Sequence, residues 1–244
     1  MLSVVVIAKN EEDELGKCLA SVPKEAEKIV IDDESTDRTV EVAKSLGAVA
    51  YPHRLENFAS QQNYGLEKAS GPWVLFLDAD EALSSQLQRE IEERLSAHPS
   101  VVGYYLRRRT IFLGRPINWG EFREQRILKL VNKNAHPRWE RPVHEVLQVS
   151  GTIGILDGAL WHNPHRNLGE FVAKINRYTE MEMQVQPTRG TPWCEIVFYP
   201  IGKFVVNYFF RLGFLDGVRG LILAVMMSYH SFLKRAKIWS RSVG

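Results

Sequence analysis

The chain has 244 residues, of which 45% are hydrophobic and 25% are charged. These values are ordinary for a globular protein, and the length is enough to bury a sizeable core in one large domain or one and a half ordinary ones. The 31 basic and 29 acidic side chains nearly cancel. The composition therefore does not suggest a general binder of polyanions, and we expect no nucleic-acid partner.

The number of cysteines and the N-terminal residues indicate the cellular compartment. Cys18 and Cys194 are the only cysteines and lie far apart in the sequence, which supports neither a disulfide framework nor a cysteine-based zinc site. The chain enters directly into the apolar run Leu2–Ile7, which is shorter than the apolar part of a signal peptide and lacks its basic lead. We therefore expect a cytoplasmic protein that is not exported.

The first hundred residues alternate between strand and helix patterns. Apolar runs that predict strands are separated by helical spacings that end at Pro23, Gly47 and Ala69. This alternation predicts a doubly wound sheet with mostly parallel strands. The predicted strands are Leu2–Ala8, Lys28–Ile31, Ala48–Tyr51 and Trp73–Leu77.

The pattern changes after residue 100. Strand candidates are now separated by loops, which predicts antiparallel or mixed pairing. A Gly- and Trp-bearing loop, Ile111–Gly120, is long enough to act as a lid or an acceptor platform. A polar helix is expected at Asn167–Gln186, and the composition becomes aromatic and apolar from Thr191. The strand candidates are Val101–Arg109, Arg126–Val131, Val143–Val149 and Thr152–Trp161.

Two of the predicted parallel strands end in paired carboxylates. Asp32-Asp33 follow the second strand, and Asp78-Ala79-Asp80 follow the fourth. A D-x-D triplet alone is weak evidence for a metal site, because about 0.6 such triplets are expected by chance in a chain of this length. Parallel strands, however, end at the same edge of a sheet, so these acids can converge on one crevice and on a divalent cation. The first strand is followed by neither G-x-G-x-x-G nor a P-loop, which argues against dinucleotide oxidoreductases and P-loop enzymes.

These blocks give the chain a specific resemblance. Ser3–Glu11, Val30–Asp37 and Leu77–Asp80 occur in the order and approximate spacing of family 2 glycosyltransferases with the GT-A fold. The Val143–Glu145 block and the Gly213–Gly217 tail resemble the lipopolysaccharide-core β-glucosyltransferase subgroup. The resemblance implies a Rossmann-like mixed sheet flanked by helices, with a C-terminal helical extension. It divides the chain into a nucleotide-sugar-binding half at 1–100, an acceptor-binding half of the same domain at 101–165, and a helical region at 166–244.

The resemblance also implies the donor site. Asp33 corresponds to the acid that binds uracil, Asp78 to a sugar or ribose contact, and Asp80 to the principal ligand of Mn²⁺ or Mg²⁺. Many family members have Gly where this chain has Glu34, so the loop after Asp33 departs from the family's pattern. The remaining implied nucleotide-sugar contacts are Ile7, Ala8, Asn10, Glu11, Gln62 and Ala79. For Gln62 and its neighbours, a solvated helix start is the alternative.

Two later residues complete the expected chemistry. Glu145 corresponds to the catalytic base of the subgroup, with a surface salt bridge to Arg138 or Arg141 as the alternative. His162 resembles the late histidine that completes metal or diphosphate binding, although a lone histidine is more often structural. The run Arg107–Arg109 alternates along a strand and would either neutralise an anionic acceptor or form a solvated edge.

The C-terminal region raises the question of membrane contact. No segment reaches the roughly 18 to 20 uninterrupted apolar residues of a spanning helix. Aromatic residues are nevertheless dense after Thr191, and the basic residues Lys234, Arg235, Lys237 and Arg241 follow without an acid among them. These features suit a peripheral element on anionic lipid. The alternative is a helical pair packed on the catalytic domain or at a dimer interface.

The sequence thus predicts an inverting, metal-dependent hexosyltransferase at the inner face of the cell membrane. It would move a hexose, glucose by expectation, from a UDP-sugar to a hydroxyl of a glycolipid such as lipopolysaccharide core. One alternative is a polyprenyl-phosphate glycosyltransferase, whose phosphate acceptor needs no general base. The other is a non-catalytic, membrane-peripheral protein that binds nucleotide sugars.

Overall fold

The computed structural model describes residues 1–97, 100–141, 145–165, 167–185 and 192–243. The chain divides into two compact units. A sheet unit comprises Met1–Arg108 and Gln125–His162, and a helical unit comprises Arg109–Glu124 and Asn163–Gly244. Each unit is described by itself below.

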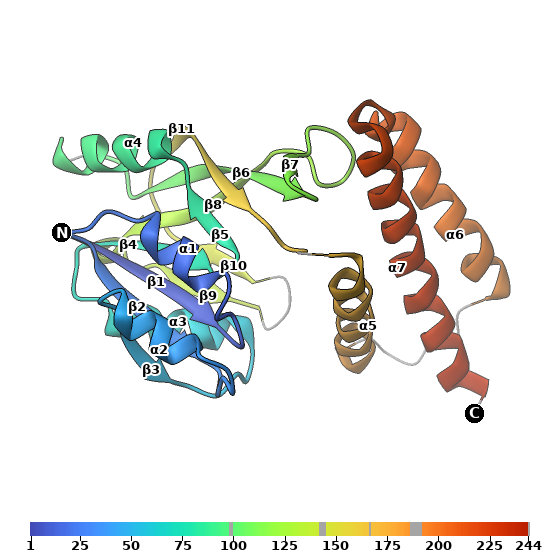
Figure 1. Ribbon diagram of the computed structural model, residues 1–244, viewed down its shortest axis with the longest axis horizontal. Helices are drawn as coiled ribbons and strands as arrows, with labels where there is room; N and C mark the ends of the chain where they lie inside the picture. The colour runs from blue at the N-terminus through green and yellow to red at the C-terminus, as the bar shows by residue number, and fades with distance from the viewer. Residues whose placement is uncertain (98–99, 142–144, 166, 186–191, 244) are drawn as a thin grey trace. The chain divides into compact units, whose positions relative to one another are not determined.

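The sheet unit is built on a mixed sheet with the strand order β3-β2-β1-β4-β8-β6-β11-β5 (Figure 1). Strands β3, β2, β1 and β4 are mutually parallel, whereas β8 is antiparallel to β4 and β6, and β11 to β5. The expected change from parallel to antiparallel pairing is confirmed. The strands are β1 (Leu2–Ala8), β2 (Glu27–Asp32), β3 (Val49–Pro52), β4 (Trp73–Asp78), β5 (Glu81–Leu83), β6 (Gly103–Phe112), β8 (Gln125–Asn132) and β11 (Ile153–His162).

Apolar side chains from both faces of the sheet form two cores. Val4 and Val6 of β1 belong to the core beneath α1 (Leu15–Ala20), α2 (Thr39–Ser45) and α4 (Ser85–Ser96). Val5 points the other way, into a core with α3 (Phe58–Lys68) and the hairpin of β9 (Arg138–Glu140) and β10 (Val146–Gln148). This alternation is the period of two expected of a strand buried on both faces.

Several boundaries differ from the sequence expectations. Helix α3 begins at Phe58 because the Asn57 side chain accepts from the Ser60 N–H in a capping box. Helix α4 and the short strand β5 were not predicted. The expected strand Val143–Val149 is shorter, since β10 covers Val146–Gln148 and residues 142–144 lie outside the described residues.

The helical unit encloses a third core, formed by Phe112, Ile117, Phe171, Ile175 and Leu223. Burial of Phe112 explains why β6 extends to that residue and pairs there with β7 (Arg115–Pro116). The expected loop Ile111–Gly120 is therefore a hairpin at its start. The helices are α5 (Leu168–Val185), α6 (Trp193–Val205) and α7 (Gly217–Val243), with a π-helical turn at Val206–Phe210 and 3-10 turns at Gly213–Asp216 and, in the sheet unit, Lys133–Ala135.

Helices α6 and α7 lie side by side as an antiparallel pair (Figure 1). Pro200 interrupts the hydrogen-bond ladder of α6, and its carbonyl accepts from the Ser228 hydroxyl of α7 at 2.7 Å. The Asp216 carboxylate accepts from the backbone N–H of Trp119 at 2.9 Å and of Asn118 at 3.3 Å. The Gly213–Gly217 motif therefore anchors the loop after β7 to the helical pair.

The basic residues of the C-terminal tail are engaged within the helical unit. Lys234 pairs with Glu182 at 2.9 Å, and Lys237 pairs with Glu180 at 3.2 Å. Arg235 lies 3.8 Å above the centre of the Tyr199 ring. The tail has no acidic residues of its own, but α5 supplies acidic partners. The basic side chains of the tail are therefore engaged, whereas the sequence alone suggests an unpaired basic cluster.

Candidate active site

The parallel strands bring the two acidic blocks to one edge of the sheet. Strand β1 lies between β2 and β4, with Ala8 opposite Asp32 and Ile7 opposite Asp78. Asp33 continues this edge, because its N–H donates to the Ala8 carbonyl at 2.9 Å. The convergence expected from the strand ends is thus present, with Ile7 and Ala8 at its centre.

Asn10 and Glu11 join the loop after β1 to the loop after β2. The Asn10 N–H donates to the Ser35 hydroxyl at 2.9 Å, and its side-chain oxygen accepts from the Thr36 N–H at 2.8 Å. The Glu11 N–H donates to the Thr39 hydroxyl at 2.8 Å. These contacts fix the position of the acids that follow β2.

Asp33 is buried and held from two sides. One carboxylate oxygen lies 2.7 Å from the Lys9 ammonium, and the other accepts from the Leu55 N–H at 2.8 Å. A carboxylate with both oxygens engaged has a fixed orientation. A nucleobase that contacts Asp33 would therefore share its carboxylate with Lys9 and with the backbone N–H of Leu55.

Glu34, the residue after Asp33, is the position at which the sequence departs from the family's pattern. Glu34 has φ 53°, in the left-handed region where a Cβ atom is strained and glycine is not. Glycine is the residue that the resemblance leads one to expect at this position. The loop therefore keeps the conformation that glycine favours, at a cost in backbone strain.

The three consecutive amide residues of α3, Gln61 to Asn63, have different surroundings. Gln61 bonds to the His53 carbonyl, and Asn63 exchanges hydrogen bonds with the backbone of Trp139. Gln62 is 2% exposed, and its side-chain oxygen has no hydrogen-bond partner among the described residues. A solvated helix start is therefore wrong for Gln61 and Gln62, and Gln62 remains the candidate for donor contact.

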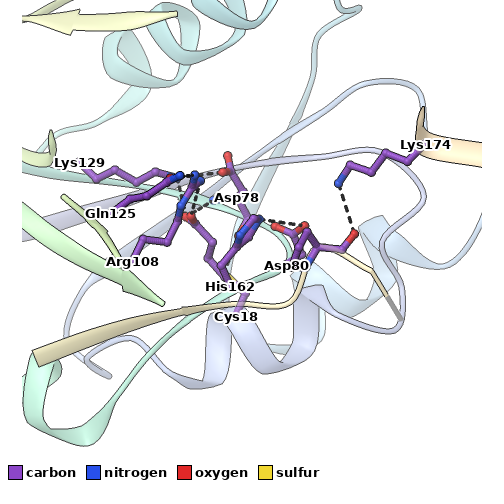
Figure 2. A network of polar contacts seen from close by, with 10 residues as sticks. Cys18, Asp78, Asp80, Arg108, Gln125, Lys129, His162 and Lys174 are labelled. Carbon is purple, nitrogen blue, oxygen red and sulfur yellow. Dashed lines mark hydrogen bonds and ion pairs between the residues drawn. The ribbon is translucent and has the colours of Figure 1, made fainter. Parts of the chain in front are cut away.

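A buried cluster of charges lies beneath the D-x-D triplet (Figure 2). Lys129 of β8 donates to Asp78 at 2.9 Å and to the adjacent Glu81. The second oxygen of Glu81 faces the Arg108 guanidinium at 3.6 Å. Sequence reasoning missed Lys129 and Glu81, although a lysine inside the apolar run Ile127–Val131 is an unusual core residue.

The electrostatics of this cluster follow from burial and pairing. Burial raises the pKa of Asp78, but the Lys129 ammonium outweighs it, so the pKa of Asp78 lies below its usual value. Glu81 is fully enclosed, and burial raises its pKa to about 7. Burial lowers the pKa of Lys129, but the carboxylates of Asp78 and Glu81 raise it by more. The pKa of Lys129 therefore lies above its usual value, and the lysine stays charged.

Asp80 and His162 come together through strand pairing. Strand β5 begins directly after Asp80 and pairs with the end of β11, which sets His162 opposite Glu81. His162 Nε2 lies 3.7 Å from Asp80 Oδ2 (Figure 2). A carboxylate and an imidazole are both ligands of divalent transition metals, so these two residues fit a partial Mn²⁺ site. Within the described ranges, no group of three or more such side chains comes together.

Ala79 and Cys18 close the floor of the site. Ala79 is buried between the two acids of the triplet. The Cys18 thiol contacts the Asp78 carbonyl at 3.6 Å, and burial raises its pKa well above the usual value. Cys18 is therefore a packing residue here rather than a nucleophile.

The structure places Glu145 directly before β10, where it is half-buried. Its companions Val143 and His144 lie outside the described residues. The β9–β10 hairpin packs through Leu147 on the core beneath α3. The role of Glu145 stays a prediction.

Other charged residues near the expected acceptor half have partners. Arg107 pairs with Asp157 at 2.5 Å, and Arg109 pairs with Glu124 at 3.1 Å. Glu121 accepts from Lys203 at 2.8 Å and from the Asn207 amide at 3.0 Å. Each of these contacts joins residues of the same unit.

The sequence comparisons show the family to which the chain belongs. Residues 3–143 match the family model described as glycosyl transferase family 2, so the chain belongs to this family of sugar-transferring enzymes. It is similar to the lipopolysaccharide core biosynthesis glycosyltransferase LpsC of Rhizobium meliloti, with 31% identity over 98% of this chain and 92% of LpsC. An uncharacterised glycosyltransferase of Rickettsia typhi is 26% identical over 97% of this chain and 86% of its own length.

A solved structure supports the fold. TarS of S. aureus, residues 1–349, superposes with a TM-score of 0.50 and 16% identity, over 98% of this chain and 88% of that one. The GT-A fold expected from the sequence is confirmed.

Proposed function

We propose that this protein transfers a hexose, glucose in our assignment, from a UDP-sugar to a hydroxyl of a lipopolysaccharide-core glycolipid, with inversion. The observation that carries this proposal is the convergence of Asp33, Asp78 and Asp80 at one sheet edge of a family 2 chain. The similarity to LpsC over nearly the whole length supports the acceptor class.

The donor would bind along this edge. Asp33 would accept from the uracil ring, and Asp78 from a hydroxyl of the sugar or the ribose. TarS, which shares the fold, was solved with UDP-GlcNAc and with UDP. The backbone at Ile7, Ala8 and Ala79 and the side chain of Gln62 would line the nucleotide sugar, while Asn10 and Glu11 hold the loops around it.

Asp80 and His162 would hold Mn²⁺ or Mg²⁺. A divalent ion supplies positive charge that offsets the charge of a diphosphate as it leaves. The chain's own contribution is the orientation of both ligands, which follows from the β5–β11 pairing. The neighbouring Asp78 is held by Lys129 instead.

An inverting transfer to a hydroxyl needs a base on the acceptor side. The hydroxyl attacks the anomeric carbon opposite the leaving UDP and is a poor nucleophile until it loses its proton. Asp33, Asp78 and Asp80 belong to the donor side. Glu145 is therefore the proposed base, whereas Glu121 and Glu124 are engaged by Lys203 and Arg109. A phosphate acceptor would need no such base, so a dispensable Glu145 would favour a polyprenyl-phosphate glycosyltransferase.

Binding and transfer with a panel of donors test the proposal. UDP-glucose, UDP-galactose, UDP-N-acetylhexosamines and GDP-mannose are titrated with and without Mn²⁺, and transfer to lipopolysaccharide core is followed. We expect metal-dependent binding of a UDP-hexose, and Asp80→Asn should reduce transfer by about 10² or more while the fold is kept, because the amide retains shape and loses charge. Full activity of the variant, or of the wild type in excess chelator, would remove the metal role; binding without transfer would favour a non-catalytic protein.

The helical unit would dock on the inner face of the cell membrane. Among the described residues, no helix is long and apolar enough to span a bilayer. The unit nevertheless exposes large apolar side chains, with Phe210 78% and Val218 72% exposed. A protein whose acceptor is a glycolipid gains from a surface that rests on lipid.

A further inference from the structure

The bend that leads from α6 into α7, residues 206–219, exposes a group of large apolar side chains. It joins the two helices at the end of the pair opposite the C-terminus (Figure 1). The exposed fraction is 78% for Phe210 and 72% for Val218. The other exposed apolar side chains of the bend are Val206, Phe209, Leu212, Phe214 and Leu215. An apolar group of this size marks a contact with another surface.

The aromatic rings of the bend support one another. The Tyr208 ring lies edge to face with the rings of Phe209 and Phe214, at centroid distances of 5.1 Å and 6.2 Å. The Arg211 carbonyl accepts from the Gly120 N–H at 2.9 Å, which ties the bend to the loop after β7. A surface that is formed before it meets its partner loses little conformational entropy on binding.

Two arginines of the bend keep their charge. The Arg211 guanidinium donates to the side-chain oxygen of Asn207 at 3.3 Å, and the Arg219 guanidinium donates to the Leu113 carbonyl at 3.2 Å and 3.3 Å. These acceptors are neutral, and neither guanidinium pairs with a carboxylate among the described residues. Asp216, the single acid in the sequence of the bend, accepts from backbone N–H groups instead. The bend therefore carries a net positive charge beside its apolar side chains.

This combination fits an anionic lipid surface better than a second copy of the chain. A guanidinium can bind two oxygens of a phosphate with parallel hydrogen bonds. At a bilayer interface, apolar side chains enter the acyl boundary while the charged ends of long side chains stay at the headgroups. A two-fold contact between copies would instead bring the same positive charges together. In the tail of α7, by contrast, Lys234 and Lys237 already pair with acids of α5.

We propose that the bend is the part of the helical unit that binds an anionic lipid bilayer, with Arg211 and Arg219 on lipid phosphates and the apolar side chains in the interface. This inference rests on the membrane docking within the proposed function. It assigns the charged lipid contact to the bend, whereas the sequence suggests the basic tail.

The double variant Arg211→Gln/Arg219→Gln tests this contact, because it removes two charges and leaves the apolar side chains in place. Lys237→Gln/Arg241→Gln is the matched control, since it removes two charges from the tail. Arg211→Lys/Arg219→Lys keeps the charge and loses the paired hydrogen bonds. Binding of the full chain to phosphatidylglycerol and phosphatidylcholine vesicles is measured by sedimentation, folding by circular dichroism, and oligomeric state by analytical ultracentrifugation.

The glutamine variant of the bend should bind phosphatidylglycerol vesicles about tenfold or more weakly than the wild type, as for two basic residues lost near an anionic surface. Its affinity for phosphatidylcholine vesicles should not change. The lysine variant should keep most of the preference for phosphatidylglycerol, and the tail variant should stay within a few-fold of the wild type. Wild-type affinity in the glutamine variant, or an equal loss in the bend and tail variants, would overturn the inference. A dimer that the glutamine variant disrupts would assign the surface to a second chain and overturn it as well.

Calorimetry with UDP-glucose on the same proteins separates this inference from the proposed transfer. All variants should bind the donor as the wild type does, because the substitutions lie in the helical unit. A wild type that binds UDP-glucose but neither kind of vesicle would refute the lipid contact and not the donor site. A wild type that binds vesicles with the expected preference but no sugar nucleotide would refute the transferase and support the lipid contact.

Discussion

At the scale of single residues, Glu34 shows how a loop can keep a conformation without the residue that favours it. Its φ of 53° costs a non-glycine residue about 1–2 kcal/mol. Glu34→Gly removes that strain but adds about 0.4–1 kcal/mol of unfolded-state entropy. We therefore expect a net stabilisation of about 0–1.6 kcal/mol in urea unfolding. Glu34→Ala, which keeps the Cβ atom, should give no gain; an equal gain in both variants would point to relief of charge instead.

Glu145 is the residue on which the proposed acceptor chemistry depends. Glu145→Gln keeps the size of the side chain and removes its ability to take a proton, so kcat should fall by about 10² to 10⁴. Donor affinity should stay nearly unchanged, because the proposed donor site is the acidic edge after β2 and β4. Steady-state kinetics and donor calorimetry separate the two quantities. Turnover within a few-fold of the wild type, or a loss of donor affinity, would place the base elsewhere.

At the scale of elements, the Gly213–Gly217 motif holds the loop after β7 in place. The Asp216 carboxylate accepts two adjacent backbone N–H groups, from Asn118 and Trp119. Asp216→Ala should cost about 1–3 kcal/mol locally, because two donors lose a charged acceptor. The amide of Trp119 should then exchange with solvent about tenfold faster or more. Glu180→Ala is the control, since its exposed pair with Lys237 contributes little; equal exchange in all three proteins would contradict the anchoring role.

The strands show which elements of the fold could be predicted from the sequence and which could not. Strands such as Leu2–Ala8 and Trp73–Asp78 were predictable because a continuous apolar run signals burial on both faces. Strand β5 was not, because its three residues depend on pairing with β11, far along the chain. Each acidic block could be found locally, but the cation that faces Asp78 could not, since Lys129 lies on the neighbouring strand β8, 51 residues further along the chain.

At the scale of the whole molecule, one surface has no partner within the described residues. On α6 the exposed apolar side chains include a row spaced by four residues, at Trp193, Val197 and Ile201, and on α7 a row spaced by three and four residues, at Val218, Leu221 and Val225. Such stripes belong to amphipathic helices that rest on lipid or on another protein. Because α5 and α6 neutralise much of the basic tail, lipid binding would depend mainly on apolar area and less on headgroup charge.

Vesicle sedimentation tests this docking surface. The full chain should bind phosphatidylglycerol vesicles more strongly than phosphatidylcholine vesicles, and salt should narrow the difference. The difference in binding free energy between the two kinds of vesicle should stay below the ~4 kcal/mol that four unpaired cations would give. Phe210→Ser/Val218→Ser should lower binding to both lipids about tenfold or more, since burying a phenylalanine contributes about 1.5–3 kcal/mol. Val49→Ser, at a 52% exposed position of β3, should change neither. Equal recovery of wild type and double variant, with dimers forming in the absence of vesicles, would show that a second chain covers this surface rather than lipid.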